Sequence, residues 1–412
     1  MLYARAAFEG GASHVAGPSR ALERASARRE EEDAFPTAVA WSRDGRACVA
    51  YDAAARAFER WDEGEGDMDA CDGAWGATSG ERAYCFVVDA RGETVTSSER
   101  DAPTTTRDLR TGALVASYLS YDEKDEVVAA CGIGYLNDFE RLACGCDGFV
   151  DVFDVSRPGR VASARVRTRT KDTAYERLGS QRGLVSCVDG CPIERDVFAC
   201  GSFSGARGVI DCGVYDARDA NGRVASWASG GGGVTQTKWS ACGNFVFVAS
   251  RKSDFISCVD VRRTGAEVYT LERRAGDTNQ RIAFDIEPCG AHLVTGGVDG
   301  CLRAFDLREG VEIMPVDANT GESYRVRIAD GACVNSFAFH PYASAPSGAI
   351  RRGFRSRFNA VCAVGERIFP NAFDDASDVS DADSDVERSS ESVRDAFGVY
   401  FLSYPTTDIA LE

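Results

Sequence analysis

The chain has 412 residues, of which 44% are hydrophobic, and a formal net charge of −17. This length and apolar content allow a large core, and no run of about 18 apolar residues is present that would span a membrane. The chain does not open with a charged segment followed by an apolar one, so we expect no secretory signal, and we expect its sixteen cysteines to be free, mostly buried thiols.

The negative charge is concentrated in three segments, 30–33, 59–72 and 374–391, which hold 19 acidic residues and only two basic ones, Arg60 and Arg388. The rest of the chain has 45 acidic and 45 basic residues. Because the acidic and basic residues of this remainder balance, its surface can still carry local basic patches. The net charge therefore does not exclude an RNA ligand.

An aspartate closes a β-rich stretch six times, with steps of 46, 46, 62, 44 and 46 residues along the chain. A period in the mid-forties with four short strands per unit is typical of a WD40 β-propeller. We therefore expect an all-β, seven-bladed propeller in which the third strand of a blade ends at the aspartate. These residues are expected to be structural, each anchoring a turn: Asp62, Asp108, Asp154, Asp216, Asp260 and Asp306.

In chain order, residues 1–34 are predicted to form a polar N-terminal arm that could lend one strand to close the ring, and residues 35–405 the propeller. The long 62-residue step is attributed to a connection over about 165–182, between blades three and four. Blade five is the clearest unit, because apolar runs alternate with short turns. Its four strands are expected at 234–240, 244–250, 255–261 and 266–272, and those of blade six at 281–287, 291–297 and 301–307.

Blade seven is expected to be interrupted. Its first two strands are predicted at 333–341 and 359–366, and its third strand is predicted much later in the chain, at 398–404. The intervening stretch 370–391 is rich in Asp and Ser with few aromatics, so we expect an acidic, disordered insertion. Residues 406–412 are expected to be a C-terminal tail.

Several strings between the aspartates go beyond the general WD40 pattern, namely 121–127, 152–160, 179–188, 232–265, 278–300 and 364–370. Together they resemble the telomerase Cajal-body WD40 protein family, in order from about Val39 to Tyr404. The resemblance is strongest at Thr278–Arg281 and Ser156–Arg160. The tryptophan of the usual Trp-Asp pair is kept only at Trp61.

The resemblance implies an RNA-binding propeller located in the nucleus, in Cajal bodies. Members of that family recognise a single-stranded CAB-box loop in small Cajal-body RNAs and, in some lineages, telomerase RNA. They associate with H/ACA ribonucleoprotein proteins, which the resemblance makes expected partners here.

Single-stranded RNA is held by planes on which bases stack and by basic groups that meet the phosphates. In a propeller the loops between strands b and c and between strands d and a share one face, so RNA-binding residues are expected there. Arg273 and Arg274 lie in one such loop. The candidates are Arg100, Lys124, Arg182, Phe203, Arg207, Arg251, Lys252, Gln280, Arg281 and Arg367. The alternative is that these are solvated arginines paired with neighbouring acids such as Asp254 or Asp277.

A second basic and aromatic patch, 351–358, lies in a connection expected on the opposite face. This patch fits RNA or an acidic protein partner. Alternatively, it is a solvated loop that docks on the acidic insertion of its own chain.

The chain has no phosphate-binding loop, no dinucleotide motif and no zinc-protease motif. Its three histidines, His14, His292 and His340, lie in unlike contexts without a nucleophile motif nearby. We therefore expect a monomeric non-enzyme without cofactor, metal or small-molecule substrate. The alternative function is a substrate receptor of a cullin-type ubiquitin ligase, because Asp-x-Arg recurs at 108–110, 260–262 and 306–308.

Overall fold

The computed structural model describes residues 35–63, 68–70, 79–169, 180–203, 209–263, 265–276, 278–314, 323, 325–329, 331–343, 359–365 and 398–402. Several expectations fall outside these ranges: the arm 1–34, the insertion 370–391, the tail 406–412, the patch 351–358, Arg207 and Arg367. In the described part of the chain, no helix is long and apolar enough to cross a membrane.

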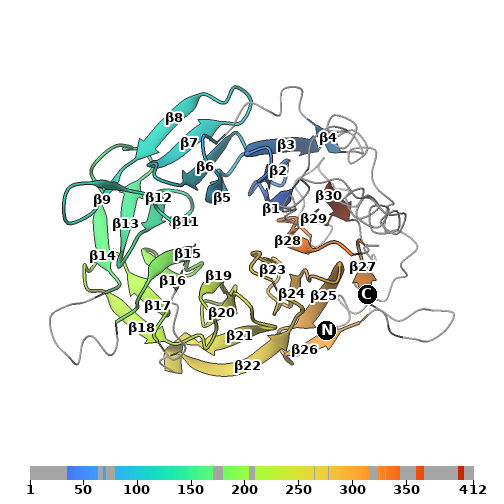
Figure 1. Ribbon diagram of the computed structural model, residues 1–412. Helices are drawn as coiled ribbons and strands as arrows, with labels where there is room; N and C mark the ends of the chain where they lie inside the picture. The colour runs from blue at the N-terminus through green and yellow to red at the C-terminus, as the bar shows by residue number, and fades with distance from the viewer. Residues whose placement is uncertain are drawn as a thin grey trace, which may run out of the picture.

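Seven antiparallel sheets are arranged as the blades of a ring, with the first strand of each blade nearest the axis (Figure 1). Blade one contains β1 (Pro36–Trp41), β2 (Ala47–Asp52), β3 (Ala57–Glu63) and β4 (Met68–Ala70), and blade two β5 (Ala83–Val88), β6 (Thr94–Glu99), β7 (Thr104–Asp108) and β8 (Leu114–Tyr118). A hairpin of β9 (Ser120–Tyr121) and β10 (Val127–Val128) precedes blade three, which contains β11 (Gly132–Leu136), β12 (Arg141–Gly145), β13 (Phe149–Asp154) and β14 (Ala164–Arg167).

The second half of the ring continues this order (Figure 1). Blade four contains β15 (Leu184–Gly190), β16 (Val197–Phe203), β17 (Cys212–Asp216) and β18 (Arg223–Trp227), and blade five β19 (Val234–Trp239), β20 (Phe245–Ser250), β21 (Phe255–Asp260) and β22 (Ala266–Glu272), with a 3₁₀ turn, η2 (Val261–Arg263), before β22. Blade six contains β23 (Phe284–Ile286), β24 (His292–Thr295), β25 (Cys301–Asp306), β26 (Val311–Ile313) and β27 (Val326–Arg327), and the described part of blade seven β28 (Val334–Phe339), β29 (Ala360–Val364) and β30 (Gly398–Leu402).

The predicted all-β propeller with seven blades is confirmed, and the aspartate repeat marks the strand ends as expected. Five of the six aspartates are the last residue of a third strand, while Asp62 lies one residue before the end of β3. In five blades the carboxylate accepts the N–H two residues further on, as Asp108 does from Arg110 at 2.9 Å and Asp306 from Arg308 at 2.8 Å. These hydrogen bonds fix the turn into the fourth strand.

Most predicted strand boundaries lie within one or two residues of the observed ones, and two differ by three residues. The connection expected over 165–182 begins later, because Ala164–Arg167 pair with β13 as the fourth strand of blade three. Strand β23 is three residues long, where seven were expected.

The ring closes by packing blade one against blade seven. Val39 and Trp61 of blade one share a core with Ala338 and Phe401 of blade seven. The side chain of Asn335 donates hydrogen bonds to the carbonyls of Pro36, at 3.0 Å, and Gly365, at 2.7 Å. The seam therefore joins the two ends of the described chain through both apolar and polar contacts.

Candidate nucleic-acid interface

Eight of the ten candidate RNA-binding residues lie in the described chain, seven in loops on the b–c and d–a face and Phe203 at the strand end beside them. Arg100 follows β6, Phe203 ends β16, and Arg251 and Lys252 join β20 to β21. Lys124 lies in the β9–β10 hairpin, Arg182 precedes β15, and Gln280 and Arg281 precede β23.

Three of these residues form one cluster, which we call the Arg–Phe–Arg cluster: Phe203, Arg251 and Arg281. The guanidinium carbon of Arg251 lies 4.1 Å from the centroid of the Phe203 ring, and that of Arg281 lies 5.4 Å from it. The three side chains come from blades four, five and six, so the cluster depends on the whole arc of the ring. Cation–π contacts of this kind are worth about 0.5–2 kcal/mol each.

Arg281 also connects two blades that are not neighbours. Its Nη1 donates a hydrogen bond of 2.9 Å to the carbonyl of Tyr84, in the first strand of blade two. The Tyr84 side chain is 37% exposed beside this contact. Tyr84 was not among the sequence candidates, because a tyrosine inside an apolar strand is usually read as a core residue.

The positive charge of the cluster is not neutralised within the described chain. Burial and the neighbouring charge of Arg281 lower the pKa of Arg251 below its ordinary value. In the described residues no carboxylate forms an ion pair with Arg251, Lys252 or Arg281, and the buried Nε of Arg251 has no hydrogen-bond partner. Two arginines held together in this way favour an anion that bridges them.

The alternative interpretation paired these arginines with acids such as Asp254, which has a different role in the structure. Its Oδ1 accepts the backbone N–H groups of Ala275, at 2.8 Å, and Gly276, at 2.7 Å. The carboxylate thus joins the loop after β20 to the loop after β22. Asp277, the other expected partner, is outside the described residues.

Arg273 is a buried anchor for the same two loops. Its side chain donates to the carbonyls of Ser250 at 3.1 Å, Ser253 at 3.3 Å and Ile282 at 2.7 Å. Arg273 is only 2% exposed, and burial lowers its pKa to about 10. The expectation that both Arg273 and Arg274 present basic groups on the loop surface is therefore wrong for Arg273. Three converging carbonyls attract a guanidinium inward, whereas Arg274 is exposed.

Lys252 extends the basic surface beside the cluster. It is exposed, and its backbone φ of +50° lies in the left-handed region that non-glycine residues rarely adopt. The tight turn between β20 and β21 holds it there, next to Arg251. Strain of this kind persists only where the surrounding structure fixes the turn.

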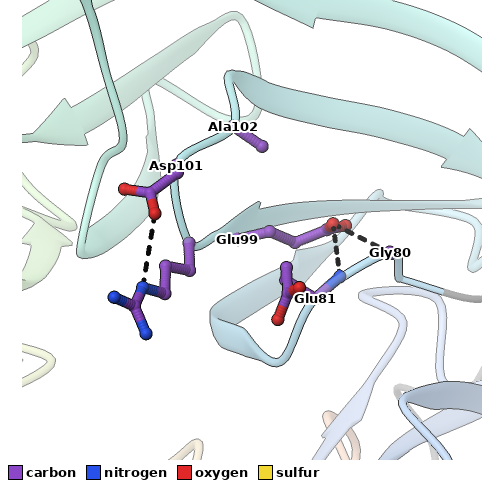
Figure 2. A pocket seen from close by; sticks show the side chains of 6 residues that line it. Gly80, Glu81, Glu99, Asp101 and Ala102 are labelled. Atoms are coloured by element: carbon purple, nitrogen blue, oxygen red, sulfur yellow. Dashed lines mark hydrogen bonds and ion pairs between the residues drawn. The ribbon is translucent and has the colours of Figure 1, made fainter.

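Three of the other candidates, Arg100, Lys124 and Arg182, lie apart from the cluster. Arg100 pairs with Asp101 at 3.3 Å and lines a hollow of about 450 Å³ together with Glu81 and Glu99 (Figure 2). The Glu99 carboxylate accepts the N–H of Gly80 at 3.1 Å. With three carboxylates and one arginine, this hollow does not favour a phosphate. Lys124 and Arg182 are exposed, and no contact joins either to the cluster in the described chain.

The arginines of the Asp-x-Arg repeats lie in the turns after the third strands, on the opposite face. Arg262 donates to both oxygens of Asp260, from Nε at 3.0 Å and from Nη2 at 2.9 Å. A guanidinium held by its own aspartate is partly neutralised. At Asp260–Arg262 this geometry weakens the ligase-receptor alternative, which needs such an arginine to bind a partner.

No family model matches the chain. Individual proteins do match it. Telomerase Cajal body protein 1 of Bos taurus is 31% identical over 290 residues, covering 70% of this chain and 47% of that protein. The protein of the same name from Homo sapiens is 30% identical over 289 residues, covering 70% and 46%.

A third relative, guanine nucleotide-binding protein negative regulator 1 of Schizosaccharomyces pombe, is 31% identical over 225 residues, which is 54% of each chain. The chain spans about half the length of the curated relatives it matches. With its seven-bladed fold and these relatives from several species, the chain belongs to the telomerase Cajal body protein family.

Proposed function

We propose that this WD40 scaffold binds single-stranded RNA at the Arg–Phe–Arg cluster. The observation that carries the proposal is a pair of arginines, Arg251 and Arg281, stacked about one phenylalanine with no ion-pair partner in the described chain. A single-stranded RNA with splayed bases supplies the matching groups: its phosphates pair with the guanidinium charges, and its bases stack on the phenyl and guanidinium planes.

The family and this geometry support one ligand class. The relatives' names place them with telomerase and Cajal bodies. We infer that the RNA is a small Cajal-body RNA, or telomerase RNA, read at its CAB-box loop. The protein would then direct H/ACA ribonucleoproteins to Cajal bodies in the nucleus. Scaffolding, rather than catalysis, is the activity that fold and relatives support.

Binding should be measured by fluorescence anisotropy with an RNA hairpin carrying a CAB-type loop and with the same stem carrying a scrambled loop. We expect the CAB loop to bind more tightly. Phe203→Ala should weaken binding by about 10-fold, since a stacked base contributes roughly 1–3 kcal/mol. The triple variant Arg251→Ala, Lys252→Ala, Arg281→Ala should weaken it further.

The matched control is Arg262→Ala. This residue is also an arginine beside a phenylalanine, Phe245, at 5.4 Å, but it lies on the opposite face. It should leave RNA affinity unchanged. Unchanged affinity of the triple variant with circular dichroism like the parent protein would overturn the proposed site.

The cargo and partners need a second experiment. Affinity purification from cells, followed by sequencing of bound RNA, should enrich small Cajal-body RNAs together with H/ACA proteins. Recovery of a ubiquitin-ligase adaptor in place of these RNAs would support the alternative function instead.

A further inference from the structure

Three side chains with metal-ligating atoms meet in the turn between β23 and β24 of blade six: Glu287, Cys289 and His292. Their ligand atoms all lie within 4.8 Å of one another. His292 Nδ1 is 2.5 Å from Glu287 Oε2. The cluster lies in an a–b turn, so it is on the face opposite the Arg–Phe–Arg cluster.

The turn is ordered by its own backbone. Gly290 donates to the carbonyl of Glu287 at 2.7 Å, and Glu287 donates to the carbonyl of His292 at 2.9 Å. Gly290 has a φ of +73°, which a glycine adopts without strain. The three ligating residues are therefore held on one hairpin before any ion binds, so little conformational entropy would be lost on binding.

The donor set defines the kind of ion. An imidazole, a thiol and a carboxylate suit Zn²⁺, which binds nitrogen and oxygen at about 2.0–2.2 Å and sulfur at about 2.3 Å. Hard cations such as Mg²⁺ and Ca²⁺ prefer oxygen ligands alone. His292 is nearly buried while Cys289 is exposed, so an ion could reach the site from solvent.

We propose that Glu287, Cys289 and His292 form a Zn²⁺ site, with the fourth position open to water. Bonds of these lengths place tetrahedral ligand atoms roughly 3.3–3.7 Å apart. The contact between His292 and Glu287 must therefore open slightly, and the Cys289 thiolate must approach. Glu287 and Cys289 lie in the turn beside the buried His292, so rotation of their side chains supplies both changes. Counting histidines along the sequence missed this site, because one imidazole is enough when a thiol and a carboxylate lie beside it.

Blade five supplies a matched control. Its a–b turn carries Cys242 between Ala241 and Gly243, as Cys289 lies between Pro288 and Gly290, and Cys242 is exposed as well. The Cys242 Sγ contacts the hydroxyl of Ser240 at 3.3 Å, and no histidine follows in that turn. Of these two turns, that of blade six has the three ligand types and that of blade five does not.

The test uses the full chain, reduced and freed of metal with a chelator, with Co²⁺ as the spectroscopic probe and Zn²⁺ as competitor. The parent protein should bind one Co²⁺ with the intense visible bands of a tetrahedral site and a thiolate charge-transfer band, and Zn²⁺ should displace it. Cys289→Ser should lose the charge-transfer band and bind Zn²⁺ at least 10-fold more weakly. Cys242→Ser should behave like the parent protein.

Three results would overturn the site: no tetrahedral Co²⁺ spectrum for the parent protein, an unchanged spectrum for Cys289→Ser, or loss of the signal in Cys242→Ser. Because Cys289 is exposed, its replacement should not affect folding, which thermal unfolding verifies. RNA affinity measured on the same variant should be unchanged, so the two sites are tested separately.

Discussion

At the scale of single residues, planarity as well as charge matters in the Arg–Phe–Arg cluster. Arg281 stacks over Phe203 and donates to the Tyr84 carbonyl at the same time. A guanidinium can do both because its donors lie in the plane that stacks. An ammonium supplies the charge and hydrogen-bond donors but has no plane that can stack.

Arg281→Lys should therefore separate stacking from charge. We expect RNA affinity to fall by about 3- to 10-fold while the salt dependence of binding stays the same, because the charge is kept. Arg281→Ala should also reduce the slope of log K against log salt by about 0.7 for single-stranded RNA. The measurement is Kd at several salt concentrations, and equal slopes for the two variants would contradict a phosphate contact at Arg281.

A second prediction at this scale concerns Asp189, whose carboxylate accepts the N–H of Trp239 at 2.8 Å. Burial raises its pKa to about 6, against the opposing charge of Lys238. At pH values between about 3.9, the pKa of an aspartate in the unfolded chain, and about 6, the folded state binds more protons at this group than the unfolded state does. The stability that this group contributes is therefore lost as the pH rises through 6. Asn keeps the hydrogen-bond acceptor and cannot ionise.

Asp189→Asn should thus gain stability relative to the parent protein, by about 1 kcal/mol, as pH rises from about 5 to 7.5. Urea unfolding at the two pH values measures this difference. A constant difference between variant and parent would show that Asp189 titrates normally.

At the scale of strands and loops, the sequence predicts strand ends better than loop interiors. The aspartates and glycine turns mark where strands stop, because their turn hydrogen bonds are local in sequence. The common face of Phe203, Arg251 and Arg281 was also predicted, since loop topology alone decides it.

What could not be predicted is which loop side chains turn inward. Arg273 and Arg274 are consecutive arginines, yet of the two it is the Arg273 guanidinium that donates hydrogen bonds to three carbonyls. Those carbonyls converge through tertiary contacts that no local pattern encodes. Tyr84 was missed for the converse reason, because its exposure depends on distant loops.

The pair Arg273 and Arg274 provides the prediction at this scale. Arg273→Met should destabilise the fold by about 2–4 kcal/mol, because three buried carbonyls lose their donor. It should also weaken RNA binding, although Arg273 is itself inaccessible, because the loops that carry Arg251 and Arg281 lose their common anchor. Arg274→Met, the exposed neighbour, should leave stability unchanged. Chemical denaturation and RNA anisotropy measure both effects, and parent-like stability of Arg273→Met would contradict the anchoring role.

At the scale of the whole molecule, the ring makes stability cooperative. Each blade packs mainly against its neighbours, as in other repeat proteins, with a few contacts such as Arg281 to Tyr84 between blades that are not adjacent, and closure makes every blade an interior one. The seam between blades one and seven carries this closure through Asn335 and the shared core around Val39 and Phe401. We therefore expect that opening the seam exposes both flanking blades together. The blades that position the RNA-binding loops would then no longer be held in a closed ring.

Asn335→Ala tests this view of the ring. It removes the donor to the carbonyls of Pro36 and Gly365, so we expect a loss of about 1–3 kcal/mol in the free energy of unfolding. If closure controls the whole ring, hydrogen exchange should increase in every blade by a similar factor, because global opening dominates. Increased exchange confined to β1 and β28 would instead show that the blades open one at a time. Asn221→Ala, at an exposed turn of blade four, is the control and should change neither stability nor exchange. RNA affinity of Asn335→Ala at low temperature should match the parent protein, since the Arg–Phe–Arg cluster lies in blades four to six and stays intact while the ring is closed.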